Sequence, residues 1–343
     1  MAKIKFREIK MSAANKRRLD LINGIIEEYQ AQGYVLTLRQ LYYQLVSRDI
    51  IPNKQAEYSK LSNLLKEGRM AGIVDWEAIE DRLRKPSRPA AFDSPQDIIN
   101  QALRQYRKDR QLGQNTHIEV WVEKDALSGV LKRVTEKYGI RIMVNRGYSS
   151  ASAMYDSYER FYDAFQENQK VKILYLGDFD PSGVDMVRDI KSRIDEFIVG
   201  SEEVKSMFEV DTESELYNDI FKHLYEKGFD SATCHKIASD MYLDEMAKEK
   251  AGDFEIIPIA LTKEQINHYQ PPPNPAKITD PRAKEFIAKH GNTSWEVDAL
   301  RPQVLNQILE DAILENIDLE RYEEILAEEL EDKEKLRKLS EKL

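Results

Sequence analysis

The stretch Lys172-Ile-Leu-Tyr-Leu-Gly-Asp-Phe-Asp-Pro-Ser-Gly-Val184 decides the fold of this chain. Its apolar run, residues 173–176, ends at Gly177 and predicts a strand that is buried on both faces inside an α/β unit. Asp178 and Asp180 follow this strand directly, at the carboxyl end where open α/β sheets place their ligands. Two carboxylates this close repel each other unless a cation neutralises them.

Two interpretations of this D-x-D pattern are open. Oxygen ligands in a loop suit Mg²⁺ (or Mn²⁺), which is held by one or two carboxylates and keeps several waters. Alternatively, the two acids form a solvated turn that caps the helix expected after Pro181-Ser182-Gly183. The short motif does not decide between a metal site and a helix cap.

A second segment, residues 116–127, favours the metal site. Its sequence alternates like a strand and ends at an acid, Glu123, before a helical stretch. A strand that ends in Glu, a βα unit and a strand that ends in D-x-D resemble the Toprim domain, which topoisomerases, primases and some nucleases share. The resemblance implies that Glu123, Asp178 and Asp180 bind the metal, with Lys124 and Asp185 as candidate neighbours of these ligands.

Composition narrows the class of protein. The chain has 343 residues, a net charge of −10 and one cysteine, which fits a reducing cytoplasm and excludes an internal disulfide framework. No apolar run approaches the roughly 20 residues of a membrane span, and no secretory signal is visible. Residues 1–72 carry 13 Lys/Arg against 7 Asp/Glu, so we expect any contact with nucleic acid at the amino terminus.

The amino-terminal region predicts a winged helix-turn-helix. Three helical stretches are followed by an extended segment, residues 72–79, that would form the wing, and Thr37 is placed to cap the second helix. A polar turn at residues 145–150 precedes a further helix and is a candidate phosphate site. The basic side chains that we expect to contact DNA in these regions are Arg17, Arg18, Arg39, Arg48, Lys54, Lys60 and Arg146.

The second helix contains a candidate nucleophile. Its apolar side chains Leu38, Leu41, Tyr42 and Leu45 recur at helical spacing, which turns Tyr42 to the core and Tyr43 outward, on the face of Arg39. A phenol beside a guanidinium can form a phosphodiester site, because Arg neutralises and orients a phosphate. An exposed Tyr that only contacts DNA fits the periodicity as well.

The segment Thr37-Leu-Arg-Gln-Leu-Tyr-Tyr43 is similar to the R-x-x-Y/F-Y signature of the A subunit of type IIB DNA topoisomerases (topoisomerase VI) and of the Spo-eleven meiotic recombination proteins. In those families a winged-helix domain with the nucleophilic tyrosine precedes a Toprim domain. The resemblance implies that Tyr43 and Arg39 are catalytic. Type IIB subunits also carry an acid-rich E-x-x-A-L segment that resembles residues 294–300, which adds Glu296 and Asp298 as acids near the site.

The resemblance further implies a protein linked to the 5′ end of double-stranded DNA, and a homodimer in which the tyrosine of one protomer meets the metal of the other. The chain is shorter than typical family members and has no ATPase, so a regulatory or ATPase partner would be encoded elsewhere. It is most similar to the stand-alone "Mini-A" relatives of mobile elements and phages. We therefore expect it in the cytoplasm, at the nucleoid of a prokaryotic host.

We expect an α/β (α+β overall) chain with four parts: a winged-helix domain over residues 1–84, a linker and connecting helix over 85–115, a Toprim-type domain over 116–300 and an acidic helical segment over 301–343. The expected function is Mg²⁺-dependent DNA cleavage by tyrosine transesterification. One alternative is a hydrolytic Toprim nuclease, associated with defence or mobile elements, in which Tyr43 only contacts DNA. Another is a non-catalytic winged-helix DNA-binding protein.

Overall fold

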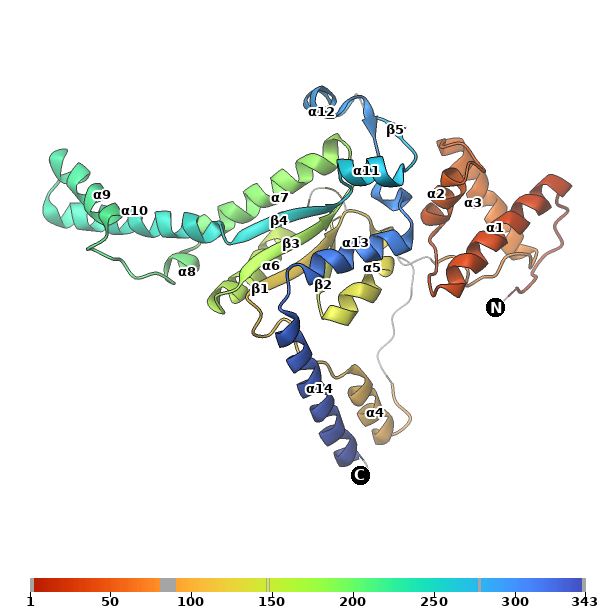
Figure 1. Cartoon of the computed structure of the whole chain (residues 1–343), viewed down its shortest axis with the longest axis horizontal. Helices are drawn as coiled ribbons and strands as arrows, with labels where there is room; N and C mark the ends of the chain where they lie inside the picture. The colour runs from red at the N-terminus through yellow and green to blue at the C-terminus, as the bar shows by residue number, and fades with distance from the viewer. Residues whose placement is uncertain (1–2, 81–90, 146, 148, 277–278, 341–343) are drawn as a thin grey trace.

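The computed structural model describes residues 3–80, 91–145, 147, 149–276 and 279–340. Its centre is a parallel four-stranded sheet with the strand order β2-β1-β3-β4 (Figure 1). The strands are β1 (Thr116–Val122), β2 (Arg141–Val144), β3 (Lys170–Leu176) and β4 (Phe254–Ala260). The predicted mixed α/β class is therefore confirmed. Because the strands are parallel, their carboxyl ends all meet at one edge of the sheet.

Helices connect the strands and cover both faces of the sheet. The crossovers contain α5 (Asp125–Tyr138), α6 (Ala151–Gln166), α7 (Pro181–Gly200), α8 (Glu202–Lys205), α9 (Glu215–Glu226) and α10 (Ser231–Ala251). Side chains alternate along β1, so Val120 and Val122 pack with α5 and α13 (Pro302–Leu314), whereas Trp121 packs with α6 and α7. This double coverage explains the continuous apolar run of β3.

The amino-terminal module is a three-helix unit with its own core, formed by α1 (Ala13–Ala31), α2 (Leu38–Ser47) and α3 (Gln55–Met70). Thr37 caps α2 as predicted, in a reciprocal capping box with Gln40. The wing that the sequence predicts at residues 72–79 does not form as a strand. Residues 72–79 contain no strand and make only isolated bridges, such as Leu36 with Ile79.

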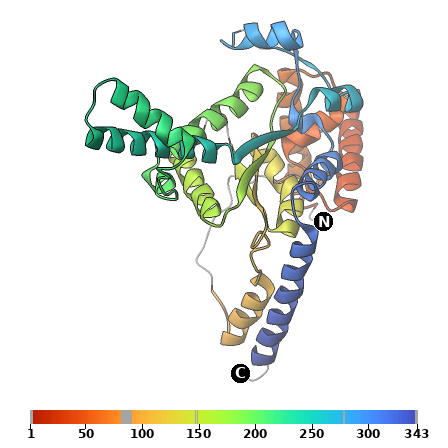
Figure 2. The same ribbon diagram turned by 60° about the vertical axis from the view of Figure 1, so that its left-hand side comes forward.

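Two helical arms leave the body of the molecule (Figures 1 and 2). One is the hairpin of α9 and α10. The other pairs α4 (Pro95–Gln105) with α14 (Leu319–Ser340), where the Tyr106 hydroxyl donates to Asp332 at 2.8 Å. Within the described ranges, no helix combines the length and apolar character that crossing a membrane requires.

The chain after β4 returns to the carboxyl edge of the sheet. It forms α11 (Lys263–Tyr269), α12 (Ala283–His290) and a small antiparallel ladder of β5 (Asn274–Pro275) with β6 (Thr293–Ser294). The 3-10 turn η1 (Val297–Ala299) follows and packs against α2. This return places residues 296–298 between the amino-terminal module and the sheet.

Candidate active site

Two acidic loops meet at the carboxyl edge of the sheet. Val122 and Leu176 are partners in the ladder of β1 and β3, so the residues that follow them lie side by side. The Glu123 carboxylate accepts a hydrogen bond from the backbone N–H of Asp178 at 2.9 Å. The register of the sheet thereby brings Glu123 to the D-x-D loop, as the sequence predicts.

Asp180 caps the helix that follows the loop. Its carboxylate accepts a hydrogen bond from the backbone N–H of Gly183 at 2.7 Å, at the start of α7. The loop is tight, because a Cβ atom on Gly183 would lie 2.2 Å from the carbonyl oxygen of Asp178. Capping uses one carboxylate oxygen, so the helix-cap interpretation of Asp180 holds and leaves the second oxygen available.

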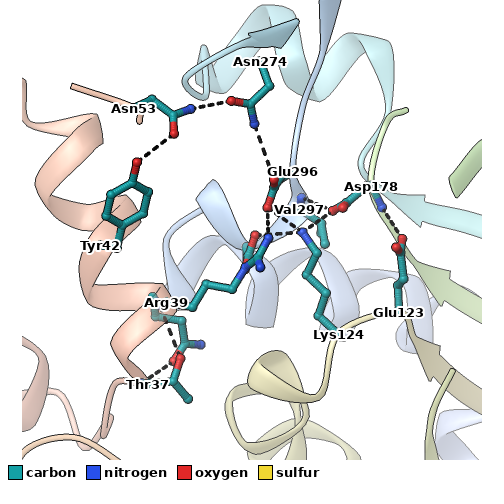
Figure 3. A network of polar contacts seen from close by, with 12 residues as sticks. Thr37, Arg39, Tyr42, Asn53, Glu123, Lys124, Asp178, Asn274, Glu296 and Val297 are labelled. Atoms are coloured by element: carbon teal, nitrogen blue, oxygen red, sulfur yellow. Dashed lines mark hydrogen bonds and ion pairs between the residues drawn. The ribbon is translucent and has the colours of Figure 1, made fainter. Parts of the chain in front are cut away.

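The returning segment adds two more acids. The backbone N–H of Val297 donates to Asp178 at 2.9 Å, which ties η1 to the loop after β3. Glu296 and Asp298 flank Val297 and enter the same cluster (Figure 3). Asp185 does not join them. It pairs with Arg188 and Arg282 on the far side of the first turn of α7.

Two cations hold this cluster together. The Lys124 ammonium lies 2.7 Å from Asp178, 2.9 Å from Glu296 and 3.0 Å from Asp298. Arg39 of α2 donates to Asp298 at 2.6 Å and also pairs with Glu296 (Figure 3). Arg39 therefore joins the amino-terminal module to the acidic edge of the sheet.

Tyr43 is buried, which corrects the expectation that it points outward. Tyr42 is 4% exposed and Tyr43 is 5% exposed. Helical periodicity predicts that Tyr43 lies off the core of its module, but Tyr43 belongs to that core, which extends to Ala299 of η1 where η1 packs against α2. The Arg39 guanidinium lies 5.7 Å from the centre of the Tyr43 ring. Burial raises the pKa of the Tyr43 hydroxyl, and the carboxylates of Asp298 and Glu296 raise it further, while Arg39 opposes them.

These groups line one cavity of about 610 Å³ between the amino-terminal module and the sheet. Most of the predicted catalytic and metal-binding side chains face it together. The lining side chains include Arg39, Tyr42, Tyr43, Asn53, Lys54, Tyr58, Glu123, Lys124, Asp178, Asp180, Asn274 and Glu296.

The donor set fits a hard divalent cation in chemistry. Four carboxylates, Glu123, Asp178, Asp180 and Glu296, line the cavity together with Arg39, Lys54 and Lys124, and a fifth, Asp298, pairs with Arg39 and Lys124. Burial raises the pKa of both Glu123 and Asp178, and neighbouring acids add to the effect in each case. Across the described ranges, neither Glu123 nor Asp180 has a salt bridge.

The side chains of these acids are not arranged as a complete set of metal ligands. No three His, Cys, Asp or Glu side chains of the described residues are arranged to hold an ion. The Lys124 ammonium lies against the Asp178 carboxylate, which is one of the expected ligands. Metal binding by Glu123, Asp178 and Asp180 therefore remains a prediction, in which Asp178 would bind the metal through Oδ2, because Oδ1 contacts Lys124 and the backbone N–H of Val297.

The expected DNA contacts do not all gather at this cavity. Arg39 and Lys54 line it. The others lie on the surface of the amino-terminal module, where Arg48 pairs with Glu28 at 2.9 Å and Lys60 with Glu57 at 2.7 Å. Arg18 approaches Glu57 at 4.0 Å, and Arg17 lines a separate hollow beside α1. Arg146 is outside the described residues.

The sequence does not predict a chain of hydrogen bonds that crosses the cavity. The Tyr42 hydroxyl donates to Asn53 at 3.0 Å, the Asn53 amide donates to Asn274 at 2.6 Å, and the Asn274 amide lies 3.5 Å from Glu296 (Figure 3). In the sequence, Asn53 follows Pro52 and reads as a helix break, while Asn274 sits in a proline-rich segment. Neither position carries a periodic signal, so only the folded chain reveals their contact.

Comparison with known proteins gives no match for this chain, whether against family models, curated proteins or solved structures.

Proposed function

We propose that this protein cleaves double-stranded DNA by tyrosine transesterification, as an A-subunit-like enzyme of the type IIB topoisomerase kind. One observation carries the proposal: a tyrosine, an arginine, a lysine and a cluster of carboxylates line a single cavity. In this proposal residues 1–84 act as a winged-helix-like module and residues 116–300 as a Toprim-type domain.

The reaction that these groups can perform is a phosphoryl transfer. The Tyr43 oxygen attacks the phosphorus, the bond from phosphorus to the 3′ oxygen breaks, and the 3′ oxygen leaves with a proton as a hydroxyl. The phenolic proton must pass to a base, either a carboxylate of this cavity or water, and the 3′ oxygen takes up a proton in exchange. The product is a 5′-phosphotyrosyl linkage.

The cations have distinct tasks in this reaction. Arg39 lies beside the Tyr43 ring and can bind a phosphate oxygen through its planar fork of donors. Lys124 supplies a point charge among the acids. Glu123, Asp178 and Asp180 would hold Mg²⁺ or Mn²⁺, which would supply positive charge to stabilise the transition state.

The proposal includes partners. Double-stranded DNA is the substrate, the protein acts as a homodimer so that both strands can be cut, and an ATPase or regulatory protein encoded elsewhere controls it. In this proposal the protein acts in the cytoplasm, at the nucleoid of a prokaryotic host or of a host that carries the phage or mobile element.

A second function, hydrolytic DNA cleavage, is supported by the burial of Tyr43. A phenol that is 5% exposed and whose pKa is raised by burial is a poor nucleophile in this conformation. Water would then attack the phosphorus, and the same carboxylates would hold the metal.

The test is plasmid cleavage in Mg²⁺ by the wild type, Tyr43→Phe, Tyr42→Phe and Asp178→Asn, with EDTA as a further arm. Transesterification predicts that Tyr43→Phe, Asp178→Asn and EDTA each abolish cutting, while Tyr42→Phe retains it. If Tyr43→Phe still cuts and Asp178→Asn does not, the enzyme is a hydrolytic nuclease. If the wild type binds DNA and never cuts it, the chain is a DNA-binding protein.

A further inference from the structure

Contacts between the amino-terminal module and the α/β domain span the cavity. Arg39 reaches from α2 to Glu296 and Asp298, and Asn53 reaches from the loop before α3 to Asn274. Figure 3 shows both connections side by side, with the polar chain continuing from Asn274 to Glu296. The two modules are therefore joined at the candidate nucleophile.

The closed cavity cannot admit duplex DNA. Its volume is about 610 Å³, and Tyr43 is 5% exposed. Because the amino-terminal module and Ala299 of η1 cover the Tyr43 side chain, a backbone phosphate of a duplex cannot reach the Tyr43 oxygen in this conformation. Access requires the amino-terminal module to move away from residues 296–298.

In the closed form, the two cations that could bind a phosphate, Arg39 and Lys124, are already paired with carboxylates. Arg39 donates to Asp298 at 2.6 Å, and Lys124 contacts Glu296 at 2.9 Å and Asp298 at 3.0 Å. Arg prefers planar anions, which it binds through two donors at once, whether they are carboxylates or phosphates. Glu296 and Asp298 thus offer Arg39 and Lys124 the same kind of anion that DNA would.

We propose that Glu296 and Asp298 hold the enzyme in a closed resting form. In this form their carboxylates pair with Arg39 and Lys124, the cations that would bind phosphate, until DNA phosphates replace the carboxylates. The inference rests on the proposed function, because it assumes DNA as the ligand. The Asn53–Asn274 contact is part of the same closure. Opening also uncovers the Tyr43 side chain, which is buried in the closed form.

A reversible cross-link tests the closure. Asn53→Cys and Asn274→Cys are combined in the full chain and joined by a short, reducible bis-methanethiosulfonate. Cys234 is buried, so it does not compete. Binding of a fluorescent DNA duplex is measured in EDTA, where cleavage cannot contribute. We expect at least a tenfold loss of affinity in the cross-linked protein and full recovery after reduction. Each single-Cys variant treated in the same way cannot be cross-linked and lacks this closing contact, so it should bind at least as tightly as the wild type.

A charge variant gives an independent readout. Glu296→Gln should bind the duplex in EDTA several-fold more tightly than the wild type, because one competing anion is lost. Glu285→Gln is the matched control, since Glu285 is exposed on α12 and pairs with Lys289. It should change affinity less than twofold.

The outcomes separate the two proposals. Equal affinity of the cross-linked and reduced forms, or equal effects of Glu296→Gln and Glu285→Gln, overturns the closed resting form and leaves the proposed function standing. Absence of DNA binding in every form overturns both.

Discussion

Glu119 shows how strongly a single buried charge constrains the protein core. It lies within β1 and is fully buried, where Arg160 of α6 donates to both carboxylate oxygens at 2.7 and 3.0 Å. Burial alone would raise the pKa of Glu119, but His117, Arg160 and the Trp121 indole stabilise the carboxylate and lower its pKa to about 2. The pair attaches α6 to the sheet.

Removal of Arg160 should therefore be costly. We expect Arg160→Met to lower the free energy of unfolding by about 3–5 kcal/mol at pH 7, because a buried carboxylate loses its partner. The pair stabilises the fold above the unfolded pKa of roughly 4.3, and this contribution is lost as pH falls toward the folded pKa of about 2. The cost should accordingly shrink at low pH.

Urea denaturation at pH 7 and pH 4 measures this cost. Arg337→Met is the control, because Arg337 is exposed and pairs with Glu334 on the surface of α14, which is worth about 0–1 kcal/mol. Equal destabilisation by the two variants would contradict the account.

Tyr43 shows what sequence could reveal about one residue and what it could not. Its position beside Arg39 follows from the spacing of α2, and the structure keeps these two side chains together. The burial of Tyr43 does not follow from this spacing, because the spacing of apolar residues in α2 does not predict contacts of α2 with a distant segment of the chain. This segment contains Asp298, which is 259 positions away from Arg39 in the chain.

At the scale of elements, the loop between β3 and α7 is the feature that positions the acids. The sequence correctly predicts a buried strand, two carboxylates and a helix in this order. It also predicts an extended wing at residues 72–79, which the structure forms only as isolated bridges. The segment buries Val74 and Ala78 in the core of the amino-terminal module, but it does so through a series of turns, so its apolar residues do not mark a strand as the apolar run of β3 does.

Gly183 provides a test of this loop. A Cβ at this position would lie 2.2 Å from the Asp178 carbonyl oxygen, so Gly183→Ala should displace the loop and abolish Mg²⁺-dependent cleavage. The Asp180 cap should weaken as well, at a cost of about 1 kcal/mol. Plasmid cleavage and thermal unfolding measure the two effects.

Gly200 is the matched control within the same helix. A Cβ there meets nothing within 4 Å, so Gly200→Ala should keep activity and stabilise α7 by up to about 1 kcal/mol. Full activity of Gly183→Ala would show that the loop geometry does not matter for the reaction.

At the scale of the whole molecule, the amino-terminal module and the α/β domain of one chain share the candidate site. The family resemblance implies that the tyrosine of one protomer meets the metal of another. In the structure, Tyr43 lines the same cavity as Glu123, Asp178 and Asp180 of its own chain. Sequence correctly predicts the mixed α/β class, because the strands and helices have distinct apolar patterns. It cannot predict how the two modules pack, because single contacts such as Asn53 with Asn274 have no periodicity.

Mixing two inactive variants tests which chain completes the site. Tyr43→Phe and Asp178→Asn each lack one essential group, and a mixture regains activity only if the groups come from different protomers. If each amino-terminal module closes again over the acids of its own chain once DNA is bound, as in the structure, the mixture stays inactive in plasmid cleavage. The control is a mixture of each variant with wild type, which should retain cutting. Recovery of activity in the double-variant mixture would show that the site is assembled between protomers.

The central claim is that Tyr43 becomes covalently joined to DNA. The most direct measurement is mass spectrometry of the protein after reaction with duplex DNA in Mg²⁺, denaturation, and digestion with nuclease and trypsin. We expect a nucleotide phosphate on Tyr43, which fragmentation of the peptide distinguishes from one on Tyr42. We also expect the 5′ ends of the cut DNA to be blocked until they are treated with protease and phosphodiesterase. Cut DNA with free 5′ phosphates and an unmodified Tyr43 would contradict the central claim.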